Sequence, residues 1–143
     1  MAWPLYRGHR GRARASRHLP GSRRVGRPAS GAAFTRADRD GTGAYREVGR
    51  EQWDVVIDVS RRPGHVRRAT TTLADRAGSF VFVSSTNVYA DHATPGTDEN
   101  AALLPALAGE VMASMDTYGQ AKVACEQHAL SGFGPGRRVP AAG

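Results

Sequence analysis

Cysteine and lysine are almost missing from this chain of 143 residues, and it contains no long apolar run. The single cysteine, Cys125, cannot form an internal disulfide or supply a multi-cysteine zinc site. The five histidines show no metal-ligand spacing, so no metal site is expected. No segment approaches the roughly 18 to 20 apolar residues of a membrane span, and the N-terminus lacks the apolar run of a secretory signal. The sequence therefore predicts a soluble, cytoplasmic protein with no membrane partner.

The positive charge is concentrated at the N-terminus. The formal net charge is +7, yet residues 1–30 hold eight arginines and no acid, whereas residues 31–143 hold twelve basic and thirteen acidic residues. Lys122 is the one lysine among twenty basic residues. Because the arginine bias is typical of a GC-rich coding sequence, the position of this single lysine is informative.

Residues 1–30 are rich in Arg, Gly and Pro and show neither a helical nor a strand period. Three interpretations stay open: a disordered segment, a basic arm that binds nucleic acid, or sequence that has lost its reading frame. Residues 134–143 have a similar composition and are expected to form a disordered or frame-altered tail. The domain itself is then expected to span residues 31–133.

A strand, a helix and a second strand are predicted in the centre of this domain. Residues 53–59 form a β-branched run typical of strands buried on both faces. Apolar residues then recur at helical spacing, with Gly78 as a helix stop: Val66, Ala69, Leu73 and Ala77. Residues 80–83 form a second apolar run. This βαβ order predicts a parallel sheet with a right-handed crossover.

The flanking elements are less regular. Residues 33–37 suggest a short strand and residues 41–50 a short, weakly amphipathic helix. Residues 90–115 form a long connection containing Pro and Gly. A last helix is predicted from Thr117 to Leu130, with Asp116 at its start and Gly132 as its stop.

Two groups of residues carry chemistry. Ser84, Ser85 and Thr86 follow the second strand, at the edge of a parallel sheet where ligands bind. The alternative is that these hydroxyls only satisfy backbone groups of a turn. Tyr118 and Lys122 are four residues apart on the last helix and so share a face, where an ammonium favours the phenolate form of the tyrosine. Alone, such a pair is common on helix surfaces.

Together, FVFVSSTNVYA and YGQAK resemble the strand-end serine motif and the Tyr-x-x-x-Lys motif of extended short-chain dehydrogenases/reductases. The resemblance implies that Ser85 holds the substrate oxygen and that Tyr118 is the acid/base. It also implies that Lys122 tunes Tyr118 and binds the nicotinamide ribose, which makes Tyr118 and Lys122 cofactor contacts as well.

The resemblance extends upstream and covers roughly residues 34–133. Asp38, in ADRDG, is similar to the Asp that contacts the adenine, and WDVVIDVS is similar to the fourth strand, whose end at Val59 and Ser60 lies along the cofactor. Within the family, these sequence segments most resemble those of bacterial NAD-dependent epimerase/dehydratase-like reductases. The implied fold is α/β, a Rossmann-like parallel sheet with flanking helices, incomplete at both ends.

Two departures from the family pattern limit what is implied. Residues 1–35 contain no Gly-rich turn between a strand and a helix, the feature that binds the dinucleotide pyrophosphate. The chain also ends soon after the Tyr-x-x-x-Lys helix, before a substrate-binding region. The choice between NAD and NADP therefore stays open, because the residue that reads the ribose is in the missing part.

The expected function is NAD- or NADP-dependent hydride transfer at a carbinol or carbonyl carbon of a small molecule, such as a nucleotide sugar. Two rival hypotheses are a non-catalytic remnant and a basic protein that binds nucleic acid through residues 1–30. A salt-dependent shift with DNA or RNA would favour the latter.

Overall fold

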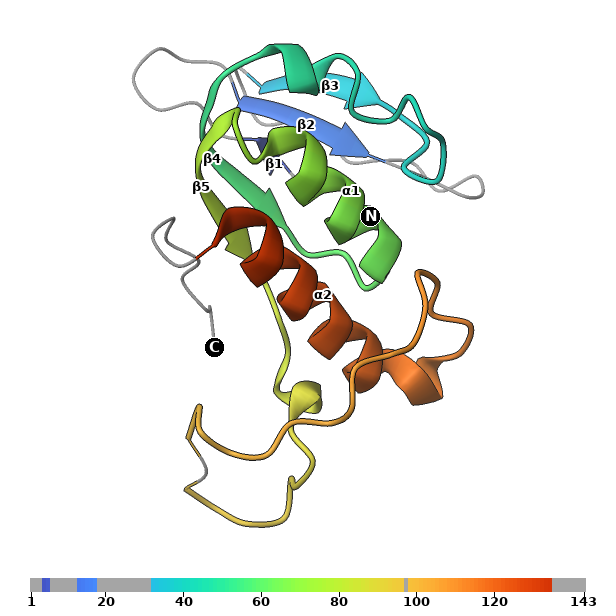
Figure 1. Ribbon diagram of the computed structural model, residues 1–143, viewed down its shortest axis with the longest axis vertical. Helices are drawn as coiled ribbons and strands as arrows, with labels where there is room; N and C mark the ends of the chain where they lie inside the picture. Colours follow the sequence, from blue (N-terminus) through green and yellow to red (C-terminus); the bar gives the residue numbers. More distant parts are fainter. Residues whose placement is uncertain (1–3, 6–12, 18–31, 97, 135–143) are drawn as a thin grey trace.

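The computed structural model describes residues 4–5, 13–17, 32–96 and 98–134, and the side chains of residues 37–96 and 98–134. Within these residues the chain is α/β, with two sheets and two helices (Figure 1). The strands are β1 (Pro4–Leu5), β2 (Ala13–Arg17), β3 (Ala32–Arg36), β4 (Trp53–Asp58) and β5 (Ala77–Phe82). The helices are α1 (Pro63–Leu73) and α2 (Tyr118–Phe133), with 3₁₀ turns η1 (Val48–Arg50), η2 (Thr86–Val88) and η3 (Met115–Thr117).

The predicted βαβ unit is present. Strands β4 and β5 pair in parallel, with a register that runs from Trp53 opposite Ala77 to Asp58 opposite Phe82, and α1 connects them. The prediction that the helix continues to Ala77 and stops at Gly78 is wrong. The helix ends at Leu73, and β5 begins at Ala77, three residues before the predicted strand. Just ahead of it, the carbonyl of Arg76 already accepts the Trp53 amide at 2.7 Å.

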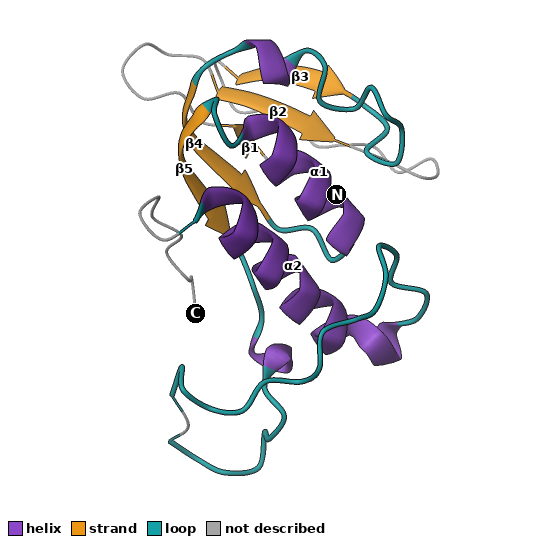
Figure 2. Cartoon of the chain, in the orientation of Figure 1, coloured by secondary structure: helices purple, strands orange, loops and turns teal. Residues whose placement is uncertain are grey.

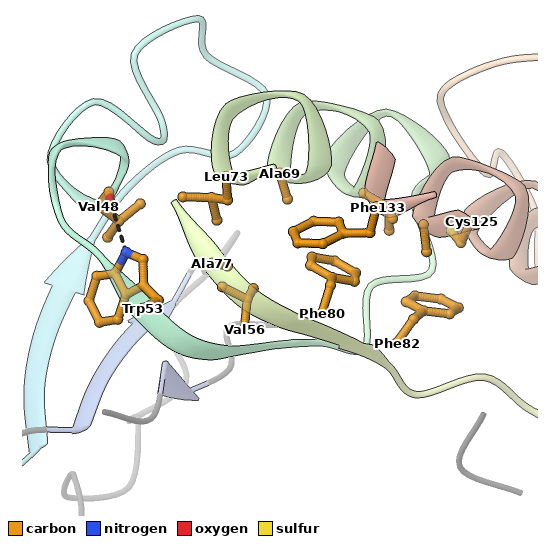
Figure 3. Close-up of a cluster of buried hydrophobic side chains, with 12 residues drawn as sticks. Val48, Trp53, Val56, Ala69, Leu73, Ala77, Phe80, Phe82, Cys125 and Phe133 are labelled. Carbon is orange, nitrogen blue, oxygen red and sulfur yellow. Dashed lines mark hydrogen bonds between the residues drawn. The ribbon is translucent and has the colours of Figure 1, made fainter. Parts of the chain in front are cut away.

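Both helices pack on the same face of β4 and β5 (Figure 2). The Phe80 ring of β5 stacks on Phe133 of α2, with centroids 4.9 Å apart. The Trp53 indole N–H donates to the Val48 carbonyl at 2.8 Å, which closes the other end of the core (Figure 3). The buried cluster consists of Val48, Trp53, Val56, Val66, Ala69, Leu73, Ala77, Phe80, Phe82, Cys125, Ala129 and Phe133.

The opposite face of these two strands is less covered than predicted. Val55 and Ile57 of β4 and Val81 of β5 alternate with the core residues and are only half-buried. The expectation that these strands are buried on both faces is therefore not met, because α1 and α2 both lie on one side.

The elements around this unit confirm some predictions and correct others. The strand predicted at residues 33–37 is present as β3, shifted by one residue toward the N-terminus. The helix predicted at residues 41–50 is wrong: successive turns lead to η1, because three glycines weaken the helix and Val48 is its only buried apolar residue. The connection at residues 90–115 has no helix or strand in its described part before η3 begins at Met115, and Leu103 makes one isolated bridge to Tyr89.

The last helix is longer than predicted. Helix α2 continues through Gly132 to Phe133, and Gly134, with a φ of 62°, follows as its C-cap. Gly132 is not a stop because it is the contact point with α1: a Cβ placed there would lie 2.4 Å from Cβ of Thr70. The glycine allows the two helices to approach closely.

The N-terminal strands form a second sheet. Strand β2 pairs in parallel with β3 and antiparallel with β1, and β1 contacts β4. The hydrogen-bonded strand orders are β1-β2-β3 in this sheet and β4-β5 in the other. The expectations for residues 1–30 and 134–143 lie largely outside the described residues and stay predictions.

Candidate functional site

Lys122 lies where the two parallel strands end. Its side chain, on the second turn of α2, is buried, with the residue 2% exposed. The ammonium Nζ donates to the carbonyl of Val83 at 2.5 Å and to that of Ser60 at 3.3 Å. Val83 directly follows β5, and Ser60 comes two residues after β4. The structure thus brings Lys122 and Ser60, two of the predicted site residues, into direct contact.

Neutral groups stabilise the positive charge of the Lys122 ammonium. Besides the two carbonyls, the ring of Phe82 lies 4.2 Å from Nζ, within the range of a cation–π interaction. Burial lowers the pKa of Lys122, and the nearby Cys125, Asp58 and Glu126 oppose this shift only in part. A buried ammonium held by neutral groups is poised to interact strongly with an anion or with a polar oxygen.

Tyr118 is the first residue of α2, half-buried and one turn before Lys122. The next residue, Gly119, fixes where this turn lies: a Cβ there would be 2.1 Å from the Asn87 carbonyl oxygen of η2. Glycine is therefore required for α2 to begin against the turn that follows β5. This contact places Tyr118 beside the segment that carries Ser85.

The hydroxyl of Ser85 is engaged within its own turn. Its Oγ accepts the Asn87 amide at 3.2 Å and donates to Asn87 Oδ1 at 2.9 Å, as the N-cap of η2. The neighbouring Ser84 differs, because its Oγ is buried and has no hydrogen-bond partner within the described part of the chain. Ser85 keeps its expected catalytic role as a prediction only.

The residues after β4 form a tight turn. Ser60 is buried, and its amide donates to Asp58 Oδ1 at 2.8 Å. Its Oγ accepts the Arg62 amide at 3.1 Å and lies 3.4 Å from Nδ1 of His65. Val59, the other residue predicted to lie along a cofactor, is half-buried. This turn directs the Ser60 carbonyl toward Lys122.

Asp38 lies in the turn after β3 and is exposed. Its carboxylate accepts the Asp40 amide at 3.0 Å, and its carbonyl accepts the Gly41 amide at 3.1 Å. None of these contacts joins Asp38 to Lys122. Its proposed contact with an adenine stays a prediction.

Sequence reasoning missed a buried ion pair beside Asp38. The Arg39 guanidinium donates to Asp58 Oδ2 at 2.5 Å and to Oδ1 at 3.3 Å, and its Nε donates to the Tyr45 hydroxyl at 2.6 Å. Burial alone would lower the pKa of Arg39, but Asp58 and Tyr45 raise it above its usual range. The signal was available: a carboxylate within the apolar run of β4 needs a buried cation.

His65 was also missed, because the histidines were considered only as metal ligands. Its Nε2 lies 2.9 Å from Asp40 Oδ1 and its Nδ1 faces Ser60 Oγ. Burial lowers the pKa of His65 to about 4, although the hydrogen bond to Asp40 acts in the opposite direction. The imidazole is therefore neutral at pH 7 and links the turn after β3 to the turn after β4.

In the described ranges, no three His, Cys, Asp or Glu side chains are grouped so that they could hold a metal ion. No described helix combines the length and hydrophobicity needed to cross a bilayer. No protein-family model matches the chain, and no curated protein matches it closely enough to show a relationship.

Proposed function

We propose that this chain carries the catalytic part of an NAD- or NADP-dependent oxidoreductase of the extended short-chain type, with a Rossmann-like fold. It would transfer a hydride at a carbinol or carbonyl carbon of a small molecule. The main support for this proposal is the position of Lys122. Its ammonium donates to backbone carbonyls of the residues that follow β4 and β5. Ligands of open parallel α/β sheets bind at this end of the strands.

The neighbours of β1 support the proposal. Strand β1 pairs with β2 and contacts β4 of the other sheet, and doubly wound dinucleotide-binding sheets place the first strand between the second and the fourth. The direction of β1, antiparallel to β2, departs from that pattern. The location is proposed to be cytoplasmic, as expected from the sequence.

Each residue of the candidate site is given a role that fits its position in the structure. Tyr118, at the start of α2, would exchange the proton of the reacting hydroxyl or carbonyl oxygen. Lys122 would favour the phenolate of Tyr118 and hold the nicotinamide ribose. Ser85 would bind the reacting oxygen once its hydroxyl leaves Asn87. Val59 and Ser60 would lie along the cofactor and Asp38 at its adenine.

Titration of NAD and NADP against the ¹⁵N-labelled chain tests the proposal. Because Lys122 is the only lysine, its ammonium gives a single side-chain NMR signal that reports on the site directly. We expect either nucleotide to shift this signal with a dissociation constant weaker than low micromolar, because the Gly-rich turn is missing. Absence of any shift at saturating concentrations of both nucleotides would refute the proposed function.

A further inference from the structure

Ser84 is the residue that the proposed function leaves unexplained. Within the described residues, its Oγ is a buried side-chain oxygen with no hydrogen-bond partner. Most buried polar side-chain atoms in folded proteins are paired, and an unpaired one destabilises the fold. A hydroxyl in this condition beside a candidate site is explained if a ligand supplies the missing partner.

Ser84 lies on the side of the sheet that faces Lys122. Strand β5 ends at Phe82, but the Val83 amide still donates to the Asp58 carbonyl at 2.8 Å, so the pairing continues past the strand. Because side chains alternate along paired backbone, we place Ser84 on the face of Phe82, whose ring is 4.2 Å from Lys122 Nζ. The residue between them, Val83, gives its carbonyl to the same ammonium at 2.5 Å. Ser84 as a whole is partly exposed although its Oγ is buried. Serine side chains adopt three staggered rotamers, and binding requires the one that turns the hydroxyl outward.

The neighbouring serine is committed elsewhere. Ser85 Oγ both donates to and accepts from Asn87, so a ligand must break two hydrogen bonds to recruit it. Ser84 Oγ breaks none. We propose that Ser84 Oγ donates a hydrogen bond to an oxygen of the nicotinamide half of the bound dinucleotide, next to Lys122. This inference rests on the proposed function and adds a binding residue to that site.

The test compares Ser84→Ala with Ser79→Ala in the full-length chain. Ser79 lies within β5, on the face opposite to that of Phe82, so it is a matched control. Nicotinamide mononucleotide is titrated while the Lys122 ammonium signal is followed, with AMP as the probe for the adenine half. We expect Ser84→Ala to weaken binding of nicotinamide mononucleotide about tenfold, as for the loss of one hydrogen bond. Ser79→Ala should leave it unchanged, and Ser84→Ala should not alter any response to AMP.

Thermal unfolding without nucleotide supplies a second measurement. Because the hydroxyl has no partner to lose, Ser84→Ala should melt at the same temperature as the wild type or at a higher one. A lower melting temperature, or a variant that does not fold, would show that Oγ has a structural partner and would overturn the inference.

The outcomes separate the two proposals. If nicotinamide mononucleotide shifts the signal equally well in the wild type and in Ser84→Ala, the role of Ser84 is refuted and the proposed function stands. If neither the mononucleotide nor NAD or NADP moves the signal in the wild type, the proposed function and this inference are both refuted.

Discussion

Single residues show how this chain stabilises charge inside a small core. Arg39 is buried against the carboxylate of Asp58, whereas Lys122 is buried against two carbonyls and the ring of Phe82. The two buried cations differ in how much of their charge is available to a ligand. A guanidinium already paired with a carboxylate has little left for a ligand, whereas the described hydrogen bonds of the Lys122 ammonium go to neutral carbonyls, which leaves it able to pair with an anionic ligand.

Tyr118→Phe tests the proposed acid/base. The substitution removes the phenolic proton and keeps the ring, so turnover of an active form of the enzyme should fall about 100- to 10,000-fold, as is typical for the loss of general acid/base catalysis. Turnover is measured from the absorbance of the reduced nicotinamide over a panel of carbinol and carbonyl compounds. Thermal unfolding should barely change. Full turnover in the variant would remove Tyr118 from the mechanism.

His65 predicts how stability depends on pH. The pKa of His65 is lowered to about 4 by burial, against an ordinary value of about 6.5. Between these values the unfolded chain binds a proton that the folded chain does not, so stability falls as the pH decreases through this window. We expect the wild type to lose about 2 kcal/mol relative to His65→Gln between pH 7 and pH 5. Urea unfolding at a series of pH values measures this difference, and parallel curves for the two proteins would contradict it.

At the scale of elements, the two helices and the long connection hold the site in place. The carbonyl of Glu110 accepts the Gly64 amide at the start of α1 at 3.0 Å, and its carboxylate pairs with Arg67 and Arg68. The connection from β5 to α2 is thereby tied to α1. Because these ion pairs are partly exposed, their contribution to stability is small, and their main effect is to fix the position of the chain.

Gly132→Ala tests the contact between α1 and α2. Alanine is the better helix former by about 1 kcal/mol, but the added Cβ would lie 2.4 Å from Cβ of Thr70. Because a backbone-fixed atom cannot move away alone, the helices must separate, and we expect a net destabilisation of about 1–3 kcal/mol. Gly43→Ala is the control, since its Cβ would meet the flexible end of Arg46 at 3.7 Å. Equal melting temperatures for the two variants would contradict the close contact.

At the scale of the whole molecule, the Arg39–Asp58 pair joins the two sheets. Arg39 follows β3 of the N-terminal sheet, and Asp58 is the last residue of β4. Both side chains are buried, so neither charge can be solvated if the other is removed.

Asp58→Ala should therefore destabilise the chain by about 3–5 kcal/mol, as expected when a buried ion pair loses one partner. The double variant Arg39→Met/Asp58→Leu removes both charges and should recover much of this loss. Chemical denaturation of the wild type and the variants measures the differences. A single variant as stable as the wild type would show that the pair does not hold the sheets together.

The sequence predicted the periodic elements of the described part of the chain better than its side-chain contacts. The βαβ unit and α2 were predictable because their apolar residues repeat at the periods of strands and helices. The contacts of Lys122 with Ser60 and Val83 were not predictable, because they are made to backbone carbonyls. Every residue has such a carbonyl, so the sequence does not indicate which ones Lys122 contacts. The Arg39–Asp58 pair depends on two residues 19 positions apart, and the end of α2 depends on the packing of Gly132 against Thr70. Such long-range contacts override local propensity.

The burial of the only lysine also gives the site its own reporter of local opening. A protease that cleaves after lysine has one target bond in this chain, between Lys122 and Val123, within the second turn of α2. That bond can be cut only when the helix unwinds and the ammonium leaves the carbonyls of Ser60 and Val83. The rate of this single cut therefore measures how often α2 opens at the candidate site.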